Sequence, residues 1–304
     1  MSVPALFSKL YRCVLLGTAN TLFLFVGIAA NSLFFWDEEG LIRARAYCSM
    51  LWAKTMCRIL GIRISLSGES FMQSGFTVCN HISYIDIAVL AGIRPTLFVA
   101  KEEMGSWPMF GWLARLAGTI FINRGSAKSA IDAMKDIKKA IDAGVNVIVF
   151  PEGTTGDGNG LLQFKNAFFN IPAALGVKVI PVSLAYGTED NDGGVCPVAW
   201  YGDMALLPHL MALLGLGRID AALSFNRTIL EDMTDQGTAY ARKRLSWLAR
   251  VSIGKGLLRM RVREYSLCGD YGSICAGASS AVHVEKLTSM QLLSDLEIKN
   301  GQLS

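Results

Sequence analysis

The sequence is poor in the residues that bind metals and nucleic acids. Among its 304 residues there are three histidines and seven cysteines, and no C-x-x-C pair occurs. Without paired cysteines or clustered histidines, we expect neither a metal site nor a bound cofactor. Charged residues make up only 18% of the chain and form no dense basic run, which argues against a nucleic-acid partner.

Motifs of two common enzyme classes are also missing. Neither G-x-x-x-x-G-K-[ST] nor G-x-G-x-x-G occurs, so the glycines between positions 153 and 160 predict a flexible loop and not a nucleotide site. No G-x-S-x-G occurs either, and a serine hydrolase would therefore have no obvious nucleophile.

A long apolar segment lies near the N-terminus. Residues 13–36 carry no charge, and as a helix they would measure about 36 Å, enough to cross a hydrocarbon core of roughly 30 Å. The segment is longer than a signal-peptide core, so we expect it to be retained. A second apolar, mildly basic helix is predicted at residues 43–60. The pair indicates a spanning helix, a hairpin that enters one leaflet and returns, or an in-plane anchor.

After Gly61 the pattern changes to strands that alternate with helices. Strands are expected at residues 62–66, 76–79, 96–100, 119–122, 145–150, 177–184 and 218–226, and helices at 126–143, 203–214 and 235–251. This alternation predicts an α/β fold with a mixed, largely parallel sheet flanked by helices. We divide the chain into membrane-anchoring helices (1–60), an α/β domain (61–266) and a C-terminal tail (267–304) with a short helix at 288–298.

The sharpest functional pattern directly follows a predicted strand. It is N-H-I-S-Y-I-D at residues 80–86, and it opens an apolar helical run. If Asp86 lies in the first turn of that helix, its carboxylate can hold one ring nitrogen of His81 and leave the other to accept a hydroxyl proton. Backbone N–H groups at the junction are the expected donors to an oxyanion. The alternative is a structural histidine that caps the helix or is buried.

Two further motifs end predicted strands at the same edge of the sheet. G-T-I-F-I-N-R ends in Arg124, whose guanidinium suits a phosphate or a carboxylate, although such an arginine is more often a solvated surface residue. V-I-V-F-P-E-G-T-T delivers Glu152, Gly153 and Thr154, which offer an acceptor, close backbone approach and a hydroxyl to a head group or to structural hydrogen bonds. Lys165 follows, and a solvated lysine is its simpler interpretation.

In order and spacing these motifs, with the apolar strand at residues 179–182, resemble the glycerolipid acyltransferase family, typified by lysophosphatidate (1-acyl-glycerol-3-phosphate) acyltransferases. The resemblance covers roughly residues 60–226 and implies acyl transfer from acyl-CoA or acyl carrier protein to a lysolipid hydroxyl, with His81 and Asp86 as the catalytic pair. It implies binding of a phosphorylated acceptor by Arg124 and residues 152–154. It also implies a place on the cytoplasmic side of the inner membrane, in agreement with the basic flank of the first helix.

The acceptor is the least determined part of this prediction. The loop at residues 153–159, with residues 200–204 and 208–210, is similar to the lyso-ornithine lipid acyltransferase branch, whose acceptor presents an amino-acid head group. Phosphatidate synthesis is thus the first prediction and lyso-ornithine lipid acylation its alternative. Two other classes stay open: a lipid thioesterase or hydrolase in which water replaces the acceptor, and a non-catalytic membrane protein of the same fold.

Overall fold

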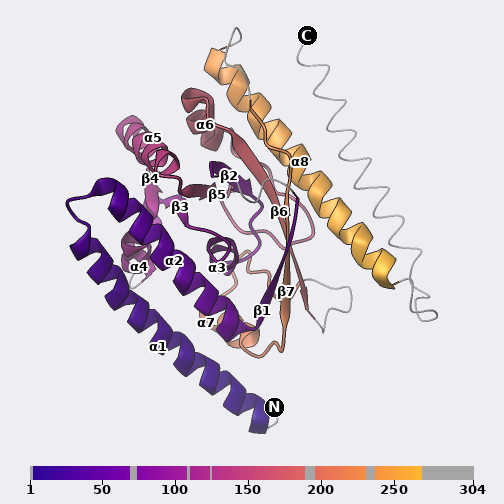
Figure 1. Ribbon diagram of the computed structural model, residues 1–304. Helices are drawn as coiled ribbons and strands as arrows, with labels where there is room; N and C mark the ends of the chain where they lie inside the picture. The colour runs from indigo at the N-terminus through magenta and orange to yellow at the C-terminus, as the bar shows by residue number, and fades with distance from the viewer. Residues whose placement is uncertain are drawn as a thin grey trace. The chain divides into compact units, whose positions relative to one another are not determined.

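The computed structural model describes residues 3–68, 74–107, 110–123, 125–188, 196–230 and 237–268. One compact unit ends at Met260 and contains every strand of the sheet. Two N-terminal helices precede an α/β domain, and a long helix, α8 (Gly237–Cys268), comes after the last strand (Figure 1).

A seven-stranded mixed sheet with the order β1-β7-β6-β2-β5-β3-β4 forms the centre of the unit. The strand β2 pairs in parallel with both β5 and β6, whereas β7 is antiparallel to β6 and parallel to β1. The predicted mixed, largely parallel sheet is confirmed, and each predicted strand is present. The strands are β1 (Ile62–Ser67), β2 (Phe76–Cys79), β3 (Thr96–Lys101), β4 (Ile120–Ile122), β5 (Asn146–Val149), β6 (Val179–Thr188) and β7 (Ile219–Phe225).

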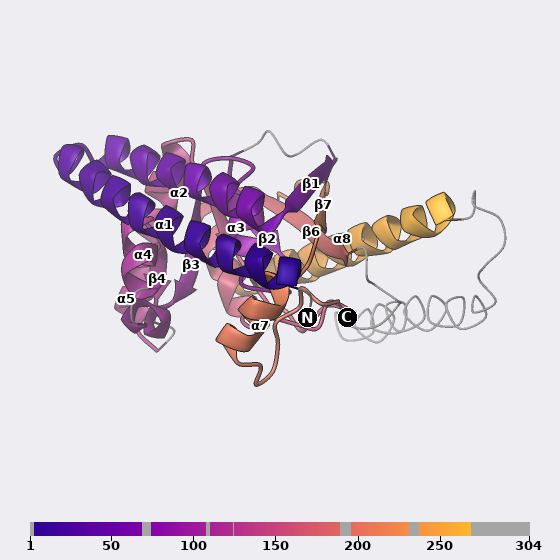
Figure 2. The same cartoon turned by 90° about the horizontal axis from the view of Figure 1, so that it is seen from below.

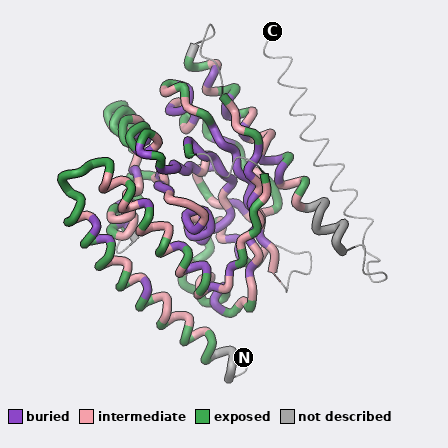
Figure 3. Tube along the Cα trace, viewed as in Figure 1, coloured by how far each residue is buried: buried purple, intermediate pink, exposed green. Residues whose placement is uncertain are grey.

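Helices cover both faces of this sheet (Figures 1 and 2). On one face lie α2 (Glu38–Leu60) and α3 (Asp86–Ala91); on the other lie α5 (Ala127–Asp142), α6 (Asn170–Leu175) and α8. Along β5, Ile148 points into the core that includes residues of α2 and α3. Val147 and Val149 point into the core that includes residues of α5, α6 and α8. All four residues of β5 are therefore buried, as the central strands in Figure 3 show.

The helices predicted within the described residues are all present, and the short helix predicted at 288–298 lies outside them. Helix α5 begins at its predicted cap, because the Ser126 hydroxyl accepts a hydrogen bond from the N–H of Ser129. Helix α7 (Leu206–Leu213) is shorter than predicted, and α8 continues past the predicted end at Val251. Neither α4 (Phe110–Leu116) nor α6 was predicted, since two turns are too short to show a helical period.

The first helix, α1 (Val3–Leu33), pairs with α2 in a hairpin and turns the side chains of Asn20 and Asn31 toward the protein. Asn20 accepts a hydrogen bond from the Trp52 indole (3.0 Å), and Asn31 donates to the carbonyl of Leu116 (3.3 Å). The outer side of α1 is apolar, with the large exposed side chains Phe7, Leu10, Tyr11, Val14, Leu22, Phe25, Ile28 and Leu33. This is the reverse of a helix on a water-soluble protein.

Helix α1 is attached to the domain near both of its ends. Arg12 donates to the carbonyls of Leu214 (3.2 Å) and Leu216 (2.7 Å), and Asn31 accepts from Arg45 (2.9 Å). The two attachment points are about 28 Å apart at 1.5 Å per residue. By length and composition α1 is the one helix among the described residues that could cross a membrane, yet it lies along the domain over this distance.

Candidate active site

The C-terminal ends of three neighbouring parallel strands meet at one edge of the sheet. His81 follows β2, Glu152 follows β5, and Tyr186 lies near the end of β6. Asn80 joins two of these strands: its amide donates to the carbonyl of Leu184 and accepts from the N–H of Leu184, both at 2.8 Å. The edge at which parallel strands end is where α/β folds place their ligands.

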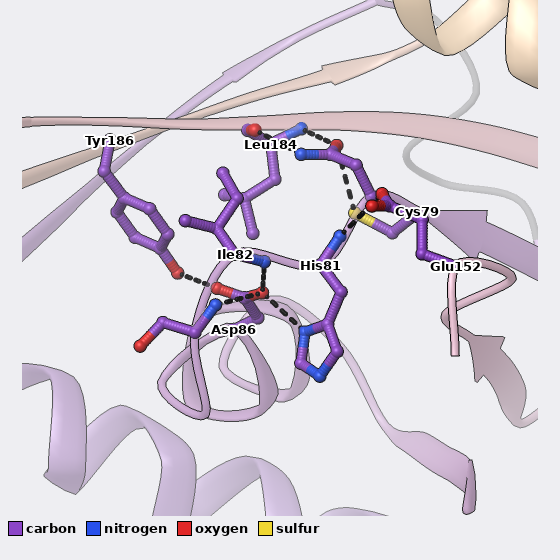
Figure 4. A network of polar contacts seen from close by, with 9 residues as sticks. Cys79, His81, Ile82, Asp86, Glu152, Leu184 and Tyr186 are labelled. Atoms are coloured by element: carbon purple, nitrogen blue, oxygen red, sulfur yellow. Dashed lines mark hydrogen bonds and ion pairs between the residues drawn. The ribbon is translucent and has the colours of Figure 1, made fainter. Parts of the chain in front are cut away.

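The predicted contact between His81 and Asp86 is present. Nδ1 of His81 lies 2.8 Å from Oδ2 of Asp86, the first residue of α3 (Figure 4). The His81 side chain is 17% exposed, and its other nitrogen, Nε2, points away from the carboxylate. His81 does not cap the helix, because the cap position is Ile85 and carries no side-chain hydrogen bond. Asp86 therefore engages Nδ1 and leaves Nε2 as the ring nitrogen that can accept a proton.

The carboxylate of Asp86 is completely buried and held by four groups. Oδ2 accepts hydrogen bonds from the N–H groups of Ile82 (2.7 Å) and Ser83 (3.0 Å) in addition to its contact with His81. Oδ1 accepts a hydrogen bond of 2.7 Å from the hydroxyl of Tyr186. Burial and the Asp86 charge raise the pKa of Tyr186, which keeps the hydroxyl a donor. The orientation of Asp86 is thus fixed without a substrate.

The ring of His81 is also supported on its face. It stacks on Phe150, with ring centroids 3.9 Å apart and planes 12° from parallel. Phe98 stacks behind Phe150 at 6.2 Å. The face of an aromatic ring attracts a cation, so this stack favours the imidazolium that forms when Nε2 takes up a proton.

Glu152 lies behind His81 and does not face the outside. It is 3% exposed, and its two oxygens accept hydrogen bonds from the N–H groups of His81 (3.2 Å) and Leu162 (3.1 Å). Burial raises the pKa of Glu152 to about 7, against the opposing effect of these two hydrogen bonds, and the nearby Asp86 charge adds to the increase. Of the two uses the sequence suggested for Glu152, the structure shows structural hydrogen bonding.

The other predicted binding residues, Gly153, Thr154 and Arg124, differ in their surroundings or lie outside the described residues. Gly153 adopts a φ of +72°, and a Cβ atom there would lie 2.7 Å from Nζ of Lys165, so the lysine side chain covers this glycine. Thr154 is exposed on the same loop, directly after Gly153. Arg124 lies outside the described residues.

Three backbone N–H groups at the junction, where oxyanion donors are expected, already donate to protein side chains. The N–H of His81 donates to Glu152, and those of Ile82 and Ser83 donate to Asp86. These groups orient the base and its partner instead, because the tight loop between β2 and α3 points them inward. The loop is also held from outside, since the N–H of Gly156 donates to the carbonyl of His81 at 2.8 Å.

Sequence reasoning missed four residues around the site. Phe150 directly follows β5 and belongs to a predicted strand that was interpreted as buried. Tyr186 lies on β6, two residues beyond the predicted end of that strand at Leu184. Tyr84 lies inside the N-H-I-S-Y-I-D motif, and its hydroxyl is 3.1 Å from Nδ1 of His209. No local pattern pairs positions separated by 125 residues.

Comparison with known proteins agrees with this geometry. Residues 63–185 match the family model described as Acyltransferase. A lyso-ornithine lipid O-acyltransferase from Rhizobium meliloti (strain 1021) is 32% identical over 251 residues, which cover 78% of this chain and 84% of the relative. A 1-acyl-sn-glycerol-3-phosphate acyltransferase from Neisseria gonorrhoeae is 30% identical over 184 residues, which cover 60% of this chain and 71% of the relative.

A solved structure has the same fold. The crystal structure of the 1-acyl-sn-glycerophosphate (LPA) acyltransferase from Thermotoga maritima superimposes with a TM-score of 0.57 and covers 85% of this chain and 97% of its own. The two sequences are 21% identical, and at this level the likeness is one of fold.

Proposed function

The chain belongs to the glycerolipid acyltransferase family, and we propose that His81 is the general base with which it acylates the hydroxyl of a lysolipid. The observation that carries the proposal is the 2.8 Å contact between His81 and the buried Asp86, which leaves Nε2 of His81 open to a substrate. The donor is a fatty acyl thioester of CoA or of acyl carrier protein. No metal or bound cofactor takes part in the proposed step.

The reaction proceeds by direct transfer. Nε2 of His81 removes the proton from the acceptor hydroxyl as its oxygen attacks the thioester carbonyl carbon. Asp86 and the face of Phe150 stabilise the resulting imidazolium. The tetrahedral intermediate then collapses, the carbon–sulfur bond breaks, and the imidazolium returns its proton to the leaving thiolate. The products are an ester and a free thiol, and the base is regenerated.

For the acceptor we favour a lyso-ornithine lipid. The relative from Rhizobium meliloti, named for that acceptor, matches over 84% of its own length. A second one, from Brucella abortus, is 33% identical over 75% of its length. This reverses the order of the two acceptors suggested by the motifs. A phosphorylated acceptor would be bound by Arg124, together with Thr154 and the Lys165 ammonium in the adjacent loop.

Lysophosphatidate is the second candidate, and a specific observation supports it. The relative from Neisseria gonorrhoeae, named for 1-acyl-sn-glycerol-3-phosphate, is 30% identical to the chain. Membranes that contain the protein should be offered both lysolipids in one reaction, with labelled acyl thioester. Preferential labelling of ornithine lipid supports the favoured acceptor, and preferential labelling of phosphatidate replaces it with the second.

We further propose that α1 is an in-plane anchor on the cytoplasmic side of the inner membrane. Its apolar side faces outward, and its polar side is bonded to the domain through Arg12 and Asn31. A helix held in this way can bury its outer side in one leaflet while the domain stays at the surface. Acyl donors are water-soluble thioesters, so the site has to face the compartment that contains them.

The base assignment is tested with His81→Ala in the full-length protein. Transfer to lysolipid should fall by a factor of about 10² to 10⁴, the usual contribution of a general base. Lys138→Ala, at an exposed position on α5, is the control and should retain the parent rate. A folded His81→Ala protein that transfers acyl groups at the parent rate would falsify the assignment. Release of free fatty acid at the same rate without lysolipid would instead indicate a hydrolase.

A further inference from the structure

Helix α7 presents an apolar surface that no described part of the chain covers. Residues 204–217 contain no charged side chain. Leu213 and Leu214 are buried at 1% exposure, but Leu207 is 68% exposed and Met211 39%. Leu207 and Met211 are four residues apart and lie on one face of the helix. Helix α7 is therefore apolar on the side that faces the core and on the side that faces outward.

This exposed face continues the outer surface of α1. The sulfur of Met211 lies 3.9 Å from the sulfur of Cys13, and the neighbouring α1 residues Leu10 and Val14 are 60% and 58% exposed. Arg12 fixes the two helices together by donating to the carbonyls that follow α7. Leu10, Val14, Leu207 and Met211 thus belong to one apolar surface, which we call the α1–α7 surface.

On its inner side α7 contacts the loop that carries the base. His209 lies between Leu207 and Met211 in the sequence, and its Nδ1 is 3.1 Å from the hydroxyl of Tyr84. The two rings meet edge to face with centroids 5.6 Å apart. Trp200 packs on Tyr84 in the same way at 5.8 Å, and its backbone N–H donates to the carbonyl of Ile82 (3.0 Å). The segment that leads into α7 and the helix itself therefore support residues 82–84.

We propose that α7 is a second membrane-contacting element, and that the Tyr84–His209 hydrogen bond transmits its contact with the bilayer to the catalytic loop. The occupant of the α1–α7 surface is a lipid bilayer, because the surface is continuous with the outer side of α1 and carries no charge on α7 to pair with a protein. Bilayer contact holds α7 against Tyr84, and Tyr84 holds the loop between His81 and Asp86. The coupling, though not the membrane contact, rests on the proposed role of His81.

Membrane contact is tested by sedimentation with vesicles of phosphatidylcholine and phosphatidylglycerol, using the full-length protein without substrates. The double variant Leu207→Asp/Met211→Asp should lower the partition coefficient at least tenfold, since two apolar side chains leave the bilayer. Leu230→Asp is the matched control. Leu230 is 58% exposed and follows Ile229, which forms a β-bridge with Val179 at the start of β6, the end of that strand away from the active site. Its partition should equal that of the parent.

Two results overturn the membrane contact. One is an unchanged partition coefficient of the folded double variant. The other is a parent that forms dimers which the double variant loses without any change in vesicle binding, because the surface would then be an interface between two copies. Neither measurement depends on turnover, so a failure of the proposed reaction would not affect them.

The coupling is tested with Tyr84→Phe, which removes the hydroxyl and keeps the ring. A water-soluble, short-chain lysolipid is acylated with and without acceptor-free vesicles, and the ratio of the two kcat values is measured. We expect the parent to be activated at least threefold by vesicles and Tyr84→Phe to show a ratio near one, while both bind vesicles equally. An equal ratio in parent and variant overturns the coupling.

Discussion

The imidazole of His81 lies flat against the ring of Phe150, with centroids 3.9 Å apart, while its edge contacts Asp86. Asp86 and Phe150 have different effects on the imidazole. The carboxylate fixes the tautomer and the direction of Nε2, and the aromatic face favours the ring in its cationic form. Both effects increase at the moment when a proton arrives on Nε2.

Replacing Phe150 separates these two contributions. In Phe150→Leu the contact with Asp86 remains but the cation loses its aromatic face. We therefore expect kcat to fall about fivefold, with KM little changed, from the roughly 1 kcal/mol of such a contact. Steady-state kinetics provide the measurement. Phe98→Leu is the matched control, because Phe98 stacks on Phe150 and not on His81. Equal losses of kcat in the two variants would show that Phe150 acts through packing alone.

Asp86→Asn tests the charge of the carboxylate separately from its position. The amide oxygen can still accept from His81 and the backbone, and the amide nitrogen can donate to the hydroxyl of Tyr186. We therefore expect a folded protein whose transfer rate is lower by at least two orders of magnitude, because the imidazolium has lost its counter-charge. Circular dichroism and the transfer assay measure the two quantities. A variant with near-parent rates would show that orientation alone is sufficient.

Tyr186→Phe removes one of the four groups that hold Asp86. The hydroxyl is buried and donates at 2.7 Å, so its loss leaves Oδ1 of Asp86 without that partner. We expect the free energy of unfolding to fall by about 1–3 kcal/mol and the transfer rate to fall less than in Asp86→Asn. Combined with Asp86→Asn, the effects should not add, since both act on one carboxyl group. Additive losses of stability and transfer rate would show that Tyr186 does not act through Asp86.

Glu152 should make stability depend on pH. Its pKa is raised from 4.5 to about 7, so the folded protein keeps a proton that the unfolded chain releases between these values. The contribution to the free energy of unfolding is complete below about pH 4.5 and is lost as the pH rises through about 7, by at most about 3.5 kcal/mol at roughly 1.4 kcal/mol per pKa unit. Denaturation of parent and Glu152→Gln in detergent at several pH values should show this decrease in the parent alone. Identical pH profiles would contradict it.

Gly153→Ala and Gly144→Ala form a matched pair. Both glycines have left-handed backbone angles, with φ of +72° and +75°, so each substitution should cost about 1–2 kcal/mol of stability. Only at position 153 does the new methyl group meet a side chain, that of Lys165; nothing lies within 4 Å at position 144. We expect Gly153→Ala alone to raise KM for lysophosphatidate, because it displaces the Lys165 ammonium that would contact a phosphorylated acceptor. Equal KM values for both variants would exclude Lys165 from acceptor binding.

Much of this arrangement was predictable because it is local. The strand, the histidine and the first residue of α3 follow one another within residues 76–86, so spacing alone predicted the contact of His81 with Asp86. The strands were predictable for the same reason, since an apolar run with β-branched residues is visible within a few positions. The hairpin of α1 and α2 is one of the arrangements left open by the sequence, and it joins two adjacent apolar segments.

The remaining features depend on contacts between distant segments. Tyr186 reaches Asp86 across 100 residues, and His209 reaches Tyr84 across 125. Glu152 accepts a hydrogen bond from the N–H of Leu162, and this contact forms only when the loop after β5 folds back. Three N–H groups at the junction are engaged for the same reason, since the side chains of Glu152 and Asp86 accept their hydrogen bonds.

The attachment of α1 along the domain has a consequence for the fate of the product. If α1 is the in-plane anchor proposed above, held by Arg12 at one end and Asn31 at the other, it does not carry the chain to the far side of the membrane. A lysolipid taken from the near monolayer is therefore released, doubly acylated, into that same monolayer. Its appearance on the opposite side requires a separate flipping step, and a growing membrane would depend on such a step to keep its two halves equal in area.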